Sequence, residues 1–162
     1  MSQLTETQSV KAAYETWALA VEVSMCIDGG RIKPDVLHPG TVVKGQLDPL
    51  WVPIREGEVS DEDFKHWGHN IGNAAFAVLA IALDEALKRR FGTARLADPN
   101  SERKAIRCIV YQLRNAFAHN ATAPEWRVTP AFQQQFESKI LGIKMNFAEL
   151  NRQPANGSDH GA

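Results

Sequence analysis

Arg114 and His119 are the residues whose types and spacing are best suited to chemistry in this chain. An arginine guanidinium is always charged and matches phosphoryl oxygens in pairs, whereas a neutral histidine exchanges a proton near neutral pH. Asn115 directly follows the arginine and adds a polar side chain. These three residues predict phosphate chemistry near the end of a helix.

That helix is predicted to begin near Asp98 or Ser101 and to end at His119 or Asn120, because Pro99 suits a first helical position. One apolar stripe comprises Ile106, Ile109, Val110, Leu113 and Phe117, and the roughly opposite side carries Cys108, Tyr111, Asn115 and His119. The second side is only weakly polar. We therefore expect contacts on both sides of the helix, with another subunit as a candidate for the second.

Two further helices are predicted, one from about Leu4 to Asp28 and one from the Ser60 cap to Phe91, each followed by glycine. With 162 residues, 44% of them hydrophobic, the chain suits one domain over 1–150, followed by a disordered tail over 151–162. The expected fold class is mainly α, an antiparallel helical bundle.

Two segments outside the helices have β character. The proline-rich and glycine-rich segment 31–59 excludes a long helix, and its residues 41–43 and 50–52 suit short strands of a functional flap or of a loop that only covers the bundle. Near the C-terminus, 126–128 and 142–147 alternate like strands, while 131–137 suits either helix or strand. A small C-terminal β extension is expected.

Composition restricts the class of protein. The net charge of −1 gives no global electrostatic basis for binding nucleic acid, so RNA binding would need a local basic patch. Cys26 and Cys108 are far apart and are expected to be reduced thiols, and the N-terminus lacks the pattern of a secretory signal. Asp84 and Glu85 interrupt the apolar run 74–83. We expect a soluble, cytoplasmic protein with no membrane partner.

The segment from Arg114 to His119, with Asn115 after the arginine and a proline-containing turn beyond it, resembles the Arg-x4-His motif of the HEPN superfamily. The resemblance covers the chain from the second predicted helix to Asn120. It implies a helical-bundle domain like those of many prokaryotic toxin and antiviral ribonucleases. HEPN-like domains also include non-catalytic binding and scaffolding members.

By this resemblance, Arg114 and His119 are the catalytic pair and Asn115 assists them. The implied reaction uses no metal or other cofactor: the RNA 2′-hydroxyl attacks the adjacent phosphate, which leaves a cyclic phosphate and a 5′-hydroxyl. Positions 114 and 119 point about 140° apart on one helix, so one copy presents a sparse site. The resemblance implies a homodimer that supplies both pairs, here with the third helix at the interface, and a toxin would add an antitoxin or regulatory partner.

The same residues also have an interpretation in which their roles are purely structural. His119 would complement the dipole at the helix C-terminus, Asn120 would cap that helix, and Arg114 would be a solvated surface residue.

Several other residues suit RNA binding. Arg103, Lys104 and Arg107 belong to a local basic excess with Lys88, Arg89, Arg90 and Arg95, which either holds RNA phosphates or provides helix-end charge and solubility. Trp51 with Arg55, and also Trp126, would stack on or grip a base, unless these tryptophans pack loops onto the bundle.

His66, His69, Asn70 and Asn73 form a polar strip on the second predicted helix. Two histidines without a defined third ligand argue against a metal site, so a polar cleft or interface is the expected role. The chain has no phosphate-binding glycine loop and no paired zinc cysteines, which disfavours ATP-dependent and metallo-hydrolase chemistry.

Overall fold

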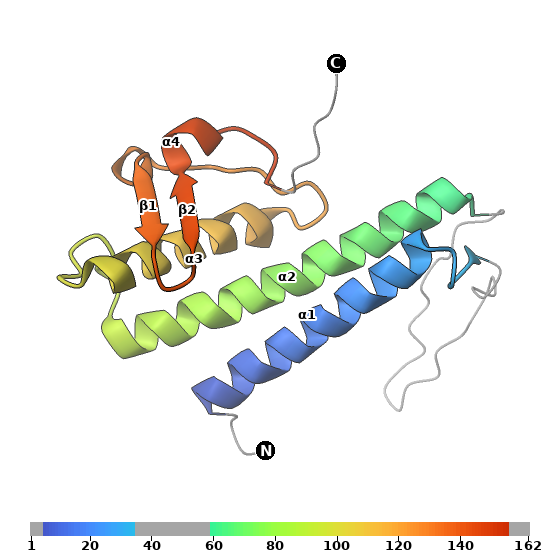
Figure 1. The fold of residues 1–162 in the computed structure, drawn as a ribbon, viewed down its shortest axis with the longest axis horizontal. Helices are drawn as coiled ribbons and strands as arrows, with labels where there is room; N and C mark the ends of the chain where they lie inside the picture. Colours follow the sequence, from blue (N-terminus) through green and yellow to red (C-terminus); the bar gives the residue numbers. More distant parts are fainter. Residues whose placement is uncertain (1–4, 35–58, 156–162) are drawn as a thin grey trace, which may run out of the picture.

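The computed structural model describes residues 5–34 and 59–155. The chain forms α1 (Glu6–Asp28), α2 (Asp61–Phe91), α3 (Ser101–His119), a 3-10 turn (Pro130–Phe132), β1 (Gln135–Ser138), β2 (Ile143–Asn146) and α4 (Phe147–Leu150). Figure 1 shows a mainly helical protein with a small two-stranded antiparallel sheet near the C-terminus. The predicted fold class is confirmed at this level.

Local capping explains where the three long helices begin. The hydroxyls of Thr5 and Ser60 accept backbone N–H groups in the first turns of α1 and α2, as expected for helix caps. α3 is capped by Asn100, whose side chain accepts the N–H of Arg103 at 2.8 Å. α2 ends at Gly92, whose φ of 77° lies in the left-handed region that glycine adopts without strain. These boundaries match the predicted helices to within a few residues.

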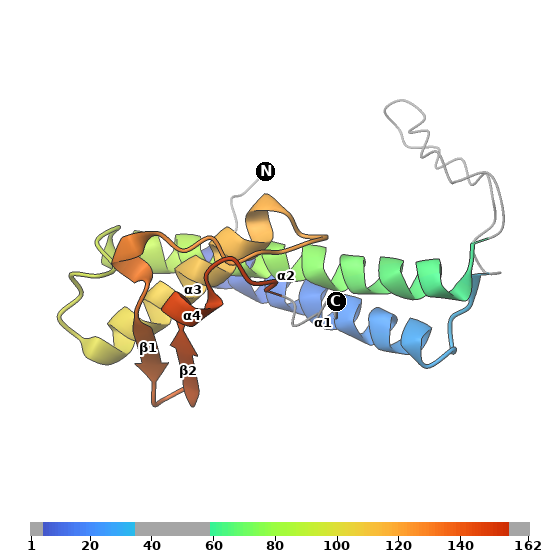
Figure 2. The same ribbon diagram turned by 90° about the horizontal axis from the view of Figure 1, so that it is seen from above.

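α2 is the central helix of the described fold, since α1 and α3 both pack against it. Figures 1 and 2 show α1 running antiparallel beside α2, while α3 covers only the C-terminal half of α2. Length and composition alone would allow α2 to cross a membrane, despite the interruption expected from Asp84 and Glu85. In the structure, α2 contributes seven buried residues to the packing against its neighbours.

The second side of α3 is covered by the chain's own C-terminal segment. Cys108 on α3 and Phe147 at the start of α4 are both 0% exposed, and they share one core with Trp126 and Phe136. The Phe147 ring centroid lies 5.4 Å from that of Trp126 and 6.0 Å from that of Phe136. The expected subunit contact on this side of α3 is therefore corrected to an intramolecular one. Trp126, at 4% exposure, packs the core and is not open to a base.

Glu102, in the first turn of α3, holds the turn between β1 and β2. Its carboxylate accepts the Ser138 hydroxyl and the backbone N–H groups of Lys139 and Ile140, the latter two at 3.1 Å. These donors lower the pKa of Glu102, with the Ser138 hydrogen bond as the largest cause. The N-terminus of α3 thus fixes the position of the hairpin.

The C-terminal β extension is confirmed, with a strand at 142–147 but none at 126–128. β2 falls within the predicted 142–147, and it pairs with 135–138, which overlaps the segment that suited either helix or strand. Residues 126–128 are extended and bond instead to the end of the chain, because the N–H of Trp126 donates to the Gln153 carbonyl at 3.0 Å. Pro130 then opens a 3-10 turn.

Residues 151–155, predicted to lie in a disordered tail, are part of the fold. The N–H of Ala155 donates to the Pro124 carbonyl at 2.8 Å, and that of Arg152 to the Trp126 carbonyl at 2.7 Å. The rest of the predicted tail, and the strands predicted at 41–43 and 50–52, lie outside the described residues.

Because Phe147 joins α3 and the C-terminal segment in one core, Phe147→Ala should destabilise the whole domain. We expect a loss of about 3–5 kcal/mol in the free energy of unfolding from the cavity it leaves. Leu141→Ala, at a site 53% exposed, is the control and should cost less than about 0.5 kcal/mol. Urea titrations followed by circular dichroism and tryptophan fluorescence measure both. Equal losses in the two variants would show that the segment is not part of the core.

Candidate functional site

Arg114, Asn115 and His119 lie at the C-terminal end of α3. Arg114 is half-buried, and its Nη1 donates to Oδ1 of Asn115 at 3.0 Å. His119 is exposed in the last turn. The side chain of the next residue, Asn120, accepts the N–H of Ala123 at 3.2 Å, so it stabilises the turn beyond the helix. The Arg-x4-His motif is thus presented at the open end of α3.

One copy of the chain does not bring the two charged members of the motif together. Within 5–34 and 59–155, no hydrogen bond joins Arg114 to His119, and neither forms an ion pair with a carboxylate. Positions five apart diverge around a helix, as the spacing predicted. Both groups are therefore free of structural partners that would compete for an anion.

Other arginines around α3 are bound to carboxylates. Arg95 donates to both oxygens of Asp84, at 2.7 and 3.0 Å, and its guanidinium lies 4.1 Å from the centroid of the Tyr111 ring. Arg103 and Arg107 both donate to Asp98, at 2.8 and 2.6 Å. Arg114 differs from all three because its only described side-chain partner is the neutral amide of Asn115.

Two members of the predicted RNA-binding patch, Arg103 and Arg107, are paired with Asp98 in the structure. Arg107 is 2% exposed, and its second guanidinium nitrogen donates to the Gly92 carbonyl at 2.6 Å. The guanidinium of Arg103 donates to Asp98, and its central carbon lies 4.7 Å from the centroid of the Phe91 ring. Arg107 is thus buried away from phosphate, and Arg103, whose side chain is 37% exposed, is already paired with a carboxylate. Lys104 is half-buried and forms no ion pair within the described chain, and Trp51 and Arg55 lie outside the described residues.

Asp98 is an ionised carboxylate inside the fold. Hydrogen bonds from Arg103 hold its pKa far below the ordinary value, against the opposing effect of burial, and Arg107 and the N–H of Asn100 add to the lowering. The ion pairs between Asp98 and the two arginines thus hold the turn between α2 and α3 against the start of α3.

A polar cleft lies beside the open end of α3. Its volume is about 670 Å³, within the range of ligand-binding pockets. The polar strip of α2 forms one wall, with His66, His69, Asn70 and Asn73, and residues 122–125 with Arg152 form the other. Nε2 of His69 lies 3.0 Å from Oδ2 of Asp28. The strip lines a cleft, as expected, and the chain reaches the other wall directly after His119.

Arg152 is the cleft residue that the sequence analysis missed. It was assigned to the tail, yet its N–H donates to the Trp126 carbonyl and its φ of 70° lies in the left-handed region. That backbone conformation is unfavourable for a residue with a Cβ and depends on the surrounding structure. No local sequence signal marks it, because the carbonyl that holds its N–H belongs to Trp126, 26 positions earlier in the chain.

No group of three or more histidine, cysteine or acidic side chains comes together as a metal site in the part of the chain that the structure describes. His69 uses one ring nitrogen for Asp28. The cleft also has the carboxylate of Glu125, which accepts from Arg127 at 3.3 Å. Its other polar side chains carry amide, imidazole, hydroxyl and guanidinium groups. Such groups recognise phosphates and nucleobases by hydrogen bonds. No family model, curated protein or solved structure matches this chain.

Asp98→Asn should make the protein less stable at pH 7, because Arg107 stays buried without its charged partner. The native pKa of Asp98 is depressed, so its contribution is complete above the unfolded-state pKa of about 4 and is lost as pH falls toward the native pKa. The stability difference from the native chain should therefore be constant above about pH 5 and shrink below about pH 4.

Chemical unfolding at a series of pH values measures this difference. Glu22→Gln, at an exposed position on α1, controls for the loss of one acidic group. A difference for Asp98→Asn that stays the same from neutral to acid pH would contradict the ionic role of Asp98.

Proposed function

We propose that this chain is a metal-independent endoribonuclease of the HEPN type that acts as a homodimer in the cytoplasm, in a toxin or phage-defence system. One observation carries the proposal: among the residues that the structure describes, Arg114 has no carboxylate partner, whereas Arg95, Arg103 and Arg107 are all paired with acids. A structural arginine is normally neutralised when it is half-buried. An arginine that is not neutralised, on the same helix end as an exposed histidine, is suited to an anion that arrives from solution.

The proposed reaction is a transesterification within RNA. The 2′-hydroxyl oxygen forms a bond to the adjacent phosphorus, and the bond from phosphorus to the 5′ oxygen breaks. One His119 takes the proton of the 2′-hydroxyl, and the partner subunit's His119 gives a proton to the leaving 5′ oxygen. Arg114 donates hydrogen bonds to the phosphoryl oxygens as negative charge builds up on them. The products are a 2′,3′-cyclic phosphate and a 5′-hydroxyl.

The polar cleft supplies a path for the RNA strand. Asn70 and Asn73 on one wall and Arg152 on the other offer amide and guanidinium donors next to the end of α3. Phosphate contacts position a strand, and amide groups bond to the edges of unstacked bases. These three cleft residues replace Arg103 and Arg107 as the proposed RNA contacts.

His119→Ala and Arg114→Ala should each lower the rate of RNA cleavage, by about 100-fold or more, because they remove the proton carrier and the charge-stabilising donor. The assay uses purified protein, single-stranded RNA and EDTA, with electrophoresis and end-group analysis of the products. Arg31→Ala, at an exposed site just past the C-terminal end of α1, is the matched control and should cleave normally.

Arg114→Lys tests geometry separately from charge and should recover only part of the activity. A native chain that binds RNA without cleaving it would overturn the ribonuclease proposal in favour of a non-catalytic binding module. Cleavage that needs a divalent metal would overturn the proposed mechanism.

A further inference from the structure

The outward face of α2 carries an exposed apolar stripe. Ile71 is 50% exposed, Val78 53% and Ile81 39%, with exposed Ala74 between them. The spacing of three and four residues places these side chains along one face of the helix. Soluble proteins rarely expose such a continuous apolar row unless it is an interaction surface.

The other sides of α2 are occupied within the chain. Gly68 contacts Ile27 of α1, since a Cβ built there would lie 3.1 Å from the Ile27 side chain. Phe76 contacts Trp17 of α1 and Phe117 of α3, with ring centroids 5.9 and 4.7 Å away. At 100° per residue the apolar stripe points away from Phe76. Figure 1 shows α1 on one side of α2 and α3 on the other, so the exposed stripe lies on a third face of the helix.

We infer that a second copy of this chain packs on the stripe, with the two α2 helices antiparallel and the two-fold axis level with Phe76. In this register Ile71 lies opposite the partner subunit's Ile81. Ala74 lies opposite the partner subunit's Val78, so a small side chain meets a larger one at the centre. In a two-fold interface each contact occurs twice, with the roles of the two copies exchanged. The residues of the stripe pair in this way only when the axis is level with Phe76.

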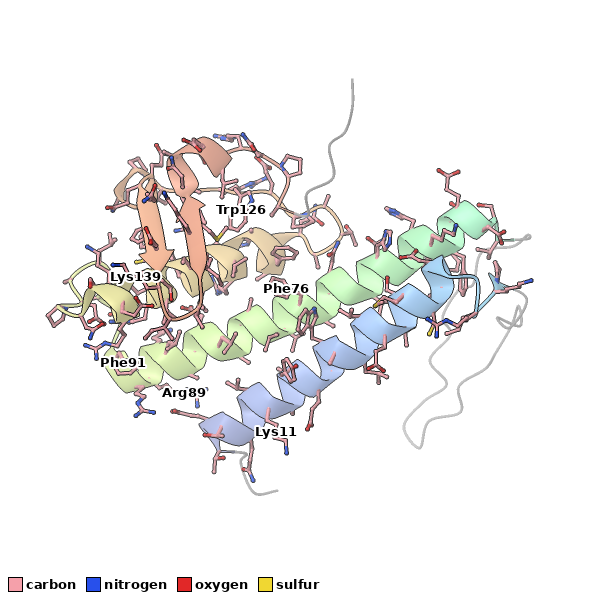
Figure 3. The ribbon with its side chains drawn as sticks, in the orientation of Figure 1. Lys11, Phe76, Arg89, Phe91, Trp126 and Lys139 are labelled. Carbon is pink, nitrogen blue, oxygen red and sulfur yellow. The ribbon has the colours of Figure 1, made fainter. Side chains whose placement is uncertain are left out.

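The charges at the ends of α2 favour a second copy in this orientation. The first turn of α2 is acidic, with Asp61, Glu62 and Asp63, and the last turn is basic, with Lys88, Arg89 and Arg90. Figure 3 labels Arg89 near the C-terminal end of the helix, with Phe76 near its middle. Antiparallel packing sets the acidic turn of each copy against the basic turn of the other, whereas parallel packing would set like charges together.

One part of this inference rests on the proposed function, namely that the dimer brings the Arg114 and His119 residues of both copies into one site. The contact between Phe76 and Phe117 puts the C-terminal end of α3 level with the axis. A two-fold axis within the interface plane keeps both α3 helices on the same side of the paired α2 helices. Each Arg114 and His119 is thus placed on one face of the dimer, close to the axis, and the partner contributes the second pair.

Val78→Asp should convert the dimer to a monomer, because it places a charge at the centre of an apolar contact. We expect the native chain to have twice the mass of 18.0 kDa in light scattering at micromolar concentration, and the variant to dissociate on the order of 100-fold more readily. Ile140→Asp, at a site 79% exposed on the β1–β2 turn, is the matched control and should remain dimeric. Circular dichroism confirms that both variants fold.

A native monomer, or a Val78→Asp dimer, would overturn the inference. Binding of the native chain to anionic phospholipid vesicles that Val78→Asp abolishes would also overturn it, because the stripe would then serve a membrane. The variant Ala74→Cys with Val78→Cys should form a covalent dimer under mild oxidation, whereas Ile140→Cys should not. Absence of that cross-link would exclude the register.

The oligomer and the activity are separable in these experiments. A dimer that lacks RNA cleavage would overturn the proposed function alone. A Val78→Asp monomer that cleaves RNA at the native rate would overturn the shared site and leave the ribonuclease chemistry standing.

Discussion

The carboxylate of Asp98 is the interaction on which the rest of the structure depends. It accepts from Arg103 and Arg107 of α3, and Arg107 reaches on to the carbonyl of Gly92 at the end of α2. These bonds fix the direction in which α3 leaves the turn. The direction of α3 in turn sets Phe117 against Phe76 and places the end of the helix beside the polar cleft. A buried charge network of this kind constrains geometry more than it adds stability.

α3 uses the same residue type for two purposes along its length. Near its N-terminus, Arg103 and Arg107 form ion pairs with Asp98. The carboxylate of Glu102 there accepts hydrogen bonds from the turn between β1 and β2. At its C-terminus, the described partner of the Arg114 side chain is the amide of Asn115. The sequence shows three arginines of equal charge on one helix, so it does not distinguish the two that pair with an acid from the third. The distinction depends on an aspartate outside the helix, whose partner cannot be identified from spacing alone.

The helices were predictable because their signals are local. Ser60 and Gly92 mark the ends of α2 by side-chain capping and by a positive φ, and both lie within one residue of the helix they bound. The C-terminal segment was harder because its pairing is decided by the core. Trp126 alternates like a strand residue, yet its burial against Phe147 turns that stretch toward the end of the chain, and Gln135–Ser138 becomes the partner of β2. Arg152 was missed for the same reason, since its conformation is held by distant backbone groups.

The burial of Cys108 explains why the proposed dimer is assembled through α2. The sequence indicates that α3 has contacts on two sides, and the structure assigns one to α2 and the other to Trp126, Phe136 and Phe147. A second subunit therefore has no large free face of α3 to bury, whereas α2 has one. The same stripe explains why α2 is apolar enough to pass as a membrane span by composition. Its hydrophobic residues pack against two neighbours within the chain and also form the exposed stripe, while the polar strip beside the cleft occupies the remaining face.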